Sequence, residues 1–163
     1  MRESHGIDDS ICDEGKKKLI IRKLFDCKKD KARFTEIYDI ISEAKSKYPV
    51  VTNETIHKYD SELDKYNMMD FDDIINICID LLYKKGSKLK TTHILVDELQ
   101  DTSQSQLELL KAIRNTTNAN VVGVGDLDQC IYEFRGARPE NVNDFISMFD
   151  CKTKPLGLNF RSK

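Results

Sequence analysis

Acidic side chains directly follow two short apolar segments of the chain. Asp97 and Glu98 come after the apolar run at residues 94–96, and Asp126 and Asp128 come after a similar run further along. A carboxylate is poor core material, because burying an unpaired charge costs several kcal/mol. These acids therefore either mark the points where strands leave the core, or hold a cation and a water molecule.

An aspartate followed by a glutamate at the end of a strand suits nucleotide hydrolysis. Asp97 can hold magnesium through its water ligands, since this ion prefers oxygen ligands and keeps much of its hydration shell. Glu98 can then orient or deprotonate the attacking water. Two alternatives stay open on this pair alone, namely an acidic surface loop and the N-cap of the following helix.

The elements that must position these acids form a βαβ pattern. Residues 92–98 (THILVDE) and 120–126 (NVVGVGD) are short β-branched runs of the kind found in buried parallel strands. Residues 103–115 between them predict a crossover helix. Its apolar positions share one face: Leu107, Leu110 and Ile113. The C-terminal half is therefore predicted to be an α/β sheet, whose ligands bind beyond the carboxyl ends of the strands. Residues 156–160 (LGLNF) could form another strand.

The N-terminal half has the spacing of helices throughout. Residues 1–14 are polar and are predicted to be loose, and helical patterns follow from Lys16. Apolar residues recur at spacings of three and four over residues 34–48, 56–66 and 71–82. Each of these patterns has a boundary signal: Pro49 ends the first, Asn53 can cap the second, and Gly86 can stop the third.

Length, charge and cysteine usage narrow the class of protein. The chain has 163 residues, enough for one ordinary domain or for a piece of something larger. Its net charge of −2 gives no bulk electrostatic reason for a nucleic-acid or membrane partner, although a near-neutral total can include a local basic face. The five cysteines are widely spaced, which favours free thiols over disulfides or a zinc site. With no apolar run of membrane-spanning length and no signal-peptide core, we expect a cytosolic protein.

Three longer segments carry a family resemblance. Residues 97–106 (DELQDTSQSQ), 124–137 (VGDLDQCIYEFRGA) and 158–162 (LNFRS) resemble successive motifs of superfamily 1 DNA helicases of the UvrD, Rep and PcrA type, in order and in spacing. Residues 69–75 (MDFDDII) resemble the short stretch upstream of those motifs. The resemblance implies an α/β fold, a partial RecA-like (P-loop NTPase) parallel sheet preceded by a helical insertion subdomain. Residues 69–163 would belong to the first motor domain, and residues 1–68, where the resemblance is weaker, to the insertion.

The resemblance also implies roles in using MgATP. Asp97 would coordinate the magnesium ion, and Glu98 would act as the catalytic base. Gln129 would contact the γ-phosphate and link its presence to the binding of DNA. Phe160 would stack on the adenine, and Arg161 would reach the γ-phosphate as an arginine finger.

A further group would bind DNA. The resemblance implies that Tyr132, Phe134 and Arg135 line the path of single-stranded DNA, with the aromatic rings stacked on bases. Aromatic faces accept any base, which suits an enzyme that moves along arbitrary sequence. Ordinary packing for the two aromatics and a solvated Arg135 remain the alternatives. For Asp70 and Asp73 we favour a capping box at the start of a helix over a catalytic role.

The chain departs from the family pattern at a few positions and in one whole motif. Phe160, Cys130 and Leu99 stand where the family usually has tyrosine, serine and often an aromatic, and none of these changes removes a catalytic group. The phosphate-binding loop GxxxxGK[ST] does not occur in the sequence. We therefore expect an internal segment of a helicase that is inactive by itself.

Three functions follow as hypotheses. The first is a segment of an ATP-driven helicase and translocase that acts on single-stranded and duplex DNA and moves 3′ to 5′, as the resemblance implies. The second is a non-catalytic module that binds DNA or a protein. The third is a magnesium nuclease using five acids: Asp97, Glu98, Asp101, Asp126 and Asp128.

Overall fold

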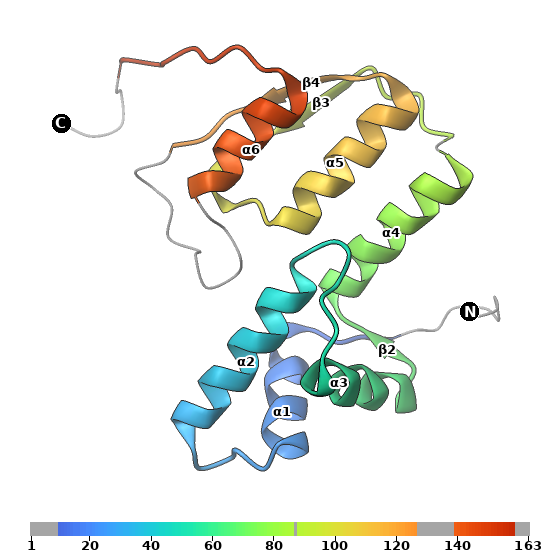
Figure 1. The fold of residues 1–163 in the computed structure, drawn as a ribbon, viewed down its shortest axis with the longest axis vertical. Coiled ribbons are helices and arrows are strands. Elements are labelled where there is room, and N and C mark those ends of the chain that lie inside the picture. The colour runs from blue at the N-terminus through green and yellow to red at the C-terminus, as the bar shows by residue number, and fades with distance from the viewer. Residues whose placement is uncertain (1–9, 87, 127–138, 159–163) are drawn as a thin grey trace.

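The fold combines a helical part with a small parallel sheet covered by helices (Figure 1). The computed structural model describes residues 10–86, 88–126 and 139–158. Its helices are α1 (Glu14–Leu24), α2 (Lys31–Lys45), α3 (Glu54–Lys65), α4 (Phe71–Lys85), α5 (Gln104–Thr117) and α6 (Pro139–Phe149), with a 3₁₀ turn, η1, at Leu99–Asp101. Its strands are β1 (Ser10–Ile11), β2 (Met68–Met69), β3 (His93–Val96) and β4 (Asn120–Gly123).

The boundary signals read from the sequence act as predicted in two of three helices. The side chain of Asn53 caps α3 by accepting a hydrogen bond of 3.0 Å from the backbone N–H of Ile56. Gly86 ends α4 with a φ of 67°, a conformation that favours glycine. The first pattern was predicted to reach residue 48, but α2 ends at Lys45. The residue before a proline is biased away from the helical conformation, so Tyr48 is a poor helical residue, and the helix has already ended with Ser46 as its C-cap.

The expectation that residues 1–14 are loose is wrong for its last part, and the N-terminal half is not entirely helical. Ser10 and Ile11 form β1, which pairs in parallel with β2 through the partners Ser10↔Met68 and Ile11↔Met69. The backbone N–H of Cys12 extends this pairing with a bond of 2.9 Å to the carbonyl of Met69. A pairing between segments so far apart in the chain leaves no periodic signal, which explains why the sequence did not reveal it.

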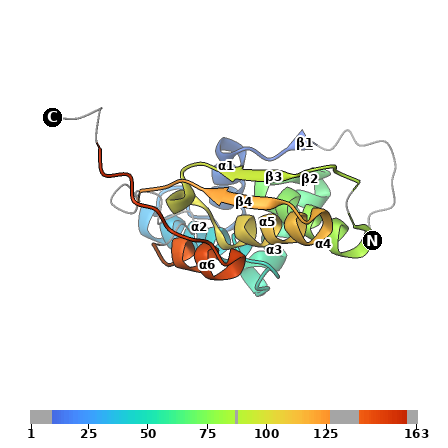
Figure 2. The same ribbon diagram turned by 90° about the horizontal axis from the view of Figure 1, so that it is seen from above.

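The predicted βαβ unit is confirmed. Strands β3 and β4 are parallel, with the register running from His93↔Asn120 to Val96↔Gly123, and α5 connects them. Helices α5 and α6 cover one face of this sheet (Figure 2). The other face leaves Leu95 77% exposed. The third predicted strand is wrong at residues 156–158, which form no strand, while residues 159 and 160 lie outside the described part.

Two separate hydrophobic cores organise the described residues. The first joins α1, α2 and α3, and its most buried members include Ile21, Ile41, Ile56 and Tyr59. The second lies between the sheet and helices α5 and α6: Leu99, Leu107, Phe145 and Phe149. Helix α4 packs along α5 and so links the two parts (Figure 1). This is a mostly helical α/β fold with small parallel sheets; the RecA-like form and the division at residue 68 remain predictions.

None of the described helices has both the length and the apolar sequence that crossing a membrane would require.

Candidate functional site

The aspartate–glutamate pair lies where β3 ends, as the sequence predicts. The chain leaves β3 at Val96, and Asp97 and Glu98 are both exposed. Glu98 adopts the left-handed conformation, with φ 50° and ψ 46°. The Oδ1 atom of Asp97 accepts a hydrogen bond of 2.9 Å from the backbone N–H of Glu98. Such a conformation costs a non-glycine residue roughly 1–3 kcal/mol and is concentrated at functional sites, so the surrounding contacts must hold it.

Gln100 supplies one of these contacts and joins the two strand ends. Its side chain is buried, with 1% of the residue exposed. The Nε2 group donates a hydrogen bond of 2.7 Å to Oε2 of Glu98. The Oε1 atom accepts one of 3.0 Å from the backbone N–H of Asp126, directly after the segment that continues β4. The sequence alone indicated no role for Gln100, although this residue lies within residues 97–106, one of the segments that resemble helicase motifs.

Close backbone packing brings the 3₁₀ turn against the second strand end. The backbone N–H of Leu99 donates a bond of 2.9 Å to the carbonyl of Val124, and the N–H of Val124 donates one of 2.8 Å to the carbonyl of Val96. A Cβ atom on Gly125 would lie 2.8 Å from Oε1 of Gln100. Glycine at position 125 therefore permits this approach, because any larger side chain would displace the amide.

Asp97 and Asp126, at the two strand ends, are exposed carboxylates, the type of ligand that Mg²⁺ prefers. In the part of the chain that the structure describes, no group of three or more His, Cys, Asp or Glu side chains is placed to hold a metal ion. The described acids of the nuclease hypothesis thus make no such group: Asp97, Glu98, Asp101 and Asp126. A single exposed carboxylate such as Asp97 suits Mg²⁺, which commonly keeps several waters and takes only one or two protein carboxylates.

The other six residues predicted for the ATP and DNA sites all lie outside the described residues: Gln129, Tyr132, Phe134, Arg135, Phe160 and Arg161. Asp128 and Cys130 lie outside as well. Of the predicted set, the structure thus locates Asp97 and Glu98 and leaves the remaining roles as predictions.

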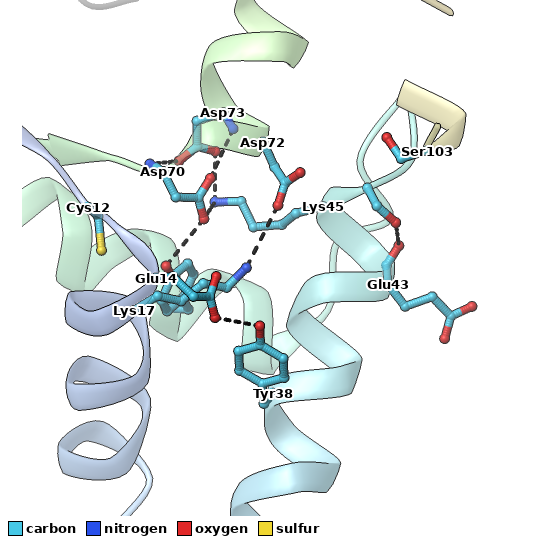
Figure 3. Close-up of polar contacts among 12 residues, drawn as sticks. Cys12, Glu14, Lys17, Tyr38, Glu43, Lys45, Asp70, Asp72, Asp73 and Ser103 are labelled. Carbon is cyan, nitrogen blue, oxygen red and sulfur yellow. Dashed lines mark hydrogen bonds and ion pairs between the residues drawn. The ribbon is translucent and has the colours of Figure 1, made fainter. Parts of the chain in front are cut away.

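A second polar cluster joins the helices of the N-terminal part (Figure 3). Lys45, at the end of α2, is 1% exposed. Its ammonium lies 2.9 Å from a carboxylate oxygen of Asp60, 3.1 Å from one of Asp70 and 2.7 Å from one of Asp73. We call these four residues the Lys45 cluster. The hydroxyl of Tyr59 also donates to Asp70, over 3.2 Å.

The predicted capping box of α4 is confirmed and is part of this cluster. The backbone N–H of Asp73 donates to Oδ1 of Asp70 over 2.9 Å, and the N–H of Asp70 donates to Oδ2 of Asp73 over 3.1 Å. The same two carboxylates therefore cap the helix and bind Lys45. The burial of Lys45 was not predicted from the sequence; its position four residues after Ile41, on the apolar face of α2, was the available signal.

The Lys45 cluster has one ammonium and three carboxylates. Burial and these charges shift the pKa values of Lys45, Asp70 and Asp73. Burial alone would lower the pKa of Lys45, but Asp70, Asp73 and Asp60 outweigh it and raise that pKa. Burial opposes ionisation of Asp70 too, yet Lys45 and Lys17 hold its pKa below the usual value. Burial raises the pKa of Asp73 to about 6, because the lowering effect of the Lys45 charge does not outweigh burial and the added repulsion from Asp70.

The raised pKa of Asp73 predicts a pH dependence of stability. The folded protein binds the proton of Asp73 more tightly than the unfolded chain, in which an aspartate titrates near about 4. The stabilising contribution of this proton is thus fully present below about pH 4 and is lost as the pH rises toward 6. Relative to the Asp73→Asn variant, the free energy of unfolding of the wild type should fall between pH 4 and pH 6. Urea unfolding of both proteins from pH 4 to pH 6 checks this, and a wild type whose stability relative to the variant stays constant or rises over that range would contradict it.

Comparison with known proteins places the chain in a family. The family model described as UvrD/REP helicase N-terminal domain matches residues 4–150. The chain is 40% identical over 116 residues to the ATP-dependent DNA helicase Rep of Buchnera aphidicola, covering 64% of this chain and 17% of that protein. It is 41% identical over 113 residues to Rep of Escherichia coli, covering 64% and 16%. It is 37% identical over 115 residues to the ATP-dependent DNA helicase PcrA of Staphylococcus epidermidis, covering 66% and 16%. The matched segment thus spans less than a fifth of each relative.

Proposed function

Since this chain belongs to the UvrD/REP helicase N-terminal domain family, we propose that it is a segment of an ATP-driven DNA helicase and translocase. The observation that supports this most directly is the geometry after β3, where Glu98 is held in a left-handed conformation between Asp97 and Gln100. The relatives named above are ATP-dependent DNA helicases. Their names support ATP and DNA as substrates of the complete protein.

We propose that the residues of these motifs have the roles in ATP hydrolysis that the family resemblance implies. Asp97 holds the hydrated magnesium ion of MgATP, and Glu98 takes the proton of the attacking water. Gln129 and Arg161 respond to the γ-phosphate, and Phe160 stacks on the adenine. These groups belong to a RecA-like motor domain formed in part by residues 69–163, with residues 1–68 as a helical insertion, and the enzyme moves 3′ to 5′. We also propose a reducing, cytoplasmic setting, in keeping with the wide spacing of the five cysteines in the sequence.

The proposed DNA contacts lead to a test in the complete protein. Tyr132→Ala and Phe134→Ala should each weaken binding of single-stranded DNA by about 1–3 kcal/mol, the typical value of one aromatic–base stack. Because stacking does not read base edges, the loss should be similar for oligonucleotides of different sequence. Fluorescence anisotropy measures the affinity, and thermal unfolding serves as the control. Normal affinity combined with early melting would assign these rings to the core instead.

We propose that the 163-residue chain does not hydrolyse ATP by itself. Its sequence lacks the GxxxxGK[ST] loop, whose backbone amides and lysine oppose the charge of the phosphates. Without that loop, Asp97, Glu98 and Asp126 present negative charge to a negative ligand. Phosphate release with magnesium, ATP and single-stranded DNA should match that of the same chain carrying Glu98→Gln. Turnover clearly above this control would reveal another phosphate site.

A further inference from the structure

One face of α4 lines a groove that the proposed function does not use. This groove, which we call the α3–α4 groove, lies between α3, β2 and α4 and has a volume of about 550 Å³. Its apolar lining residues are Leu63, Met68, Ile77 and Leu81. Ile77 and Leu81 lie one turn apart on α4 and are 43% and 45% exposed. Apolar surface that is left open inside a groove marks an interaction site.

The charged residues that line the groove are mostly acidic: Asp60, Asp64, Asp73, Asp80 and Lys84. Four aspartates and one lysine give the lining a net charge of −3 at neutral pH. Lys45 and Asp70 lie close by but are both buried, and their charges offset each other. The groove therefore combines apolar surface with a negative electrostatic field.

These carboxylates have partners within the chain and can still accept further hydrogen bonds. Asp60 and Asp73 bind the ammonium of Lys45 at 2.9 Å and 2.7 Å. Asp80 accepts a hydrogen bond of 2.7 Å from the hydroxyl of Tyr48. An ionised carboxylate has two oxygens with about four lone-pair sites. Lysine or arginine side chains of a partner can therefore bind here without displacing these contacts.

We propose that the α3–α4 groove docks an amphipathic helix with basic flanks, presented by a separate protein. A helix binds in a groove through apolar residues spaced three and four apart. That stripe would cover Ile77 and Leu81, while lysines or arginines beside it would face the aspartates. Complementary charge of this kind accelerates encounter and fixes orientation. The inference goes beyond the proposed function and depends on neither nucleotide nor Glu98.

A second copy of this chain would fit the groove less well. The stripe of α4 in another molecule would bring its own Asp73 and Asp80 against those of the first, and like charges placed together are unfavourable. Helix α1 is rich in lysine and has the suitable charge. Among its large apolar side chains, however, Leu19 alone is exposed, so α1 offers no apolar stripe.

The test uses the 163-residue chain and synthetic peptides of 15 residues, the length of α4. The first peptide has leucines at spacings of three and four, lysines on both flanks and alanine elsewhere. The second has the same composition in an order that spreads the leucines around the helix, and in the third glutamates replace the lysines. By fluorescence anisotropy, we expect the first to bind at least about tenfold more tightly than the others. Its affinity should fall as salt is added, because exposed charge pairs are screened.

Variants of the chain connect this affinity with the groove. Ile77→Ser combined with Leu81→Ser removes the exposed apolar pair and should weaken binding of the first peptide at least about tenfold. Leu19→Ser combined with Val51→Ser is the matched control, since these side chains are 66% and 56% exposed outside the groove, and it should bind as the wild type. Asp64→Lys should weaken the first peptide and strengthen the third. Circular dichroism establishes that each variant is folded.

The inference would be overturned by equal affinity for the first two peptides, or by unchanged affinity in the Ile77→Ser, Leu81→Ser variant. Self-association in sedimentation experiments that this variant abolishes would assign the groove to a second copy instead. The same titration is then made on the complete helicase, where we expect the first peptide to bind as tightly as it binds the 163-residue chain. Loss of binding there would show that another segment of the helicase fills the groove, and would also overturn the inference.

Discussion

The Lys45→Met variant is expected to lose about 3–5 kcal/mol of free energy of unfolding, the usual cost of removing one partner from a buried ion pair. Methionine can fill much of the space of the lysine stem, so the change removes mainly the charge. Asp70, itself buried, would then face Asp73 without a cation between them. Urea denaturation at neutral pH, followed by circular dichroism, measures the loss.

A second lysine variant, Lys47→Met, tests whether the loss of stability depends on the burial of the lysine. Lys47 also binds a carboxylate, at 2.8 Å from Glu43, but its side chain is 36% exposed. Lys47→Met should therefore cost no more than about 1 kcal/mol. Adding Asp73→Asn to Lys45→Met should recover part of the stability, because it removes one of the uncompensated charges. A loss below about 1 kcal/mol for Lys45→Met would mean that water, and not the lysine, stabilises these carboxylates.

Glu98→Gln in the complete helicase should lower the rate of ATP hydrolysis by about 10²–10⁴-fold, the usual contribution of a general base. The substitution tests basicity with little change of shape. A glutamine at position 98 still offers an oxygen to the N–H of Gln100, so the bridge to Asp126 can persist. Binding of MgATP should remain, since Asp97 and the phosphate-binding groups are unaltered.

Phosphate release under single turnover and titration with a fluorescent ATP analogue measure the two properties separately. Glu36→Gln, the same substitution at an exposed position of α2, should behave as the wild type. Near-normal turnover in Glu98→Gln would exclude this residue from the mechanism. Loss of nucleotide binding together with turnover would instead indicate that Glu98 helps to hold the metal.

Local sequence patterns predicted much of the framework of the site. The β-branched runs at residues 92–98 and 120–126 contain β3 and β4, and the predicted crossover helix between them is α5. Such periodicity reflects which face of an element is buried, and this is a property of neighbouring residues. The same reasoning found the carboxylates beyond β3 and the capping box of Asp70 and Asp73. The same reasoning wrongly predicted a strand at residues 156–158. These residues have apolar character but no partner strand, and they form no strand.

By itself, the sequence thus determined the order of the elements, several of their caps, and the place of Asp97 and Glu98 at a strand end. Tertiary structure decided what those residues contact. Lys45 is buried because α3 and the start of α4 bring three carboxylates to the end of α2. Gln100 becomes a bridge only because β4 pairs beside β3 and places the N–H of Asp126 within reach. Both contacts join residues distant in the chain, and no local period encodes a hydrogen bond across such a separation.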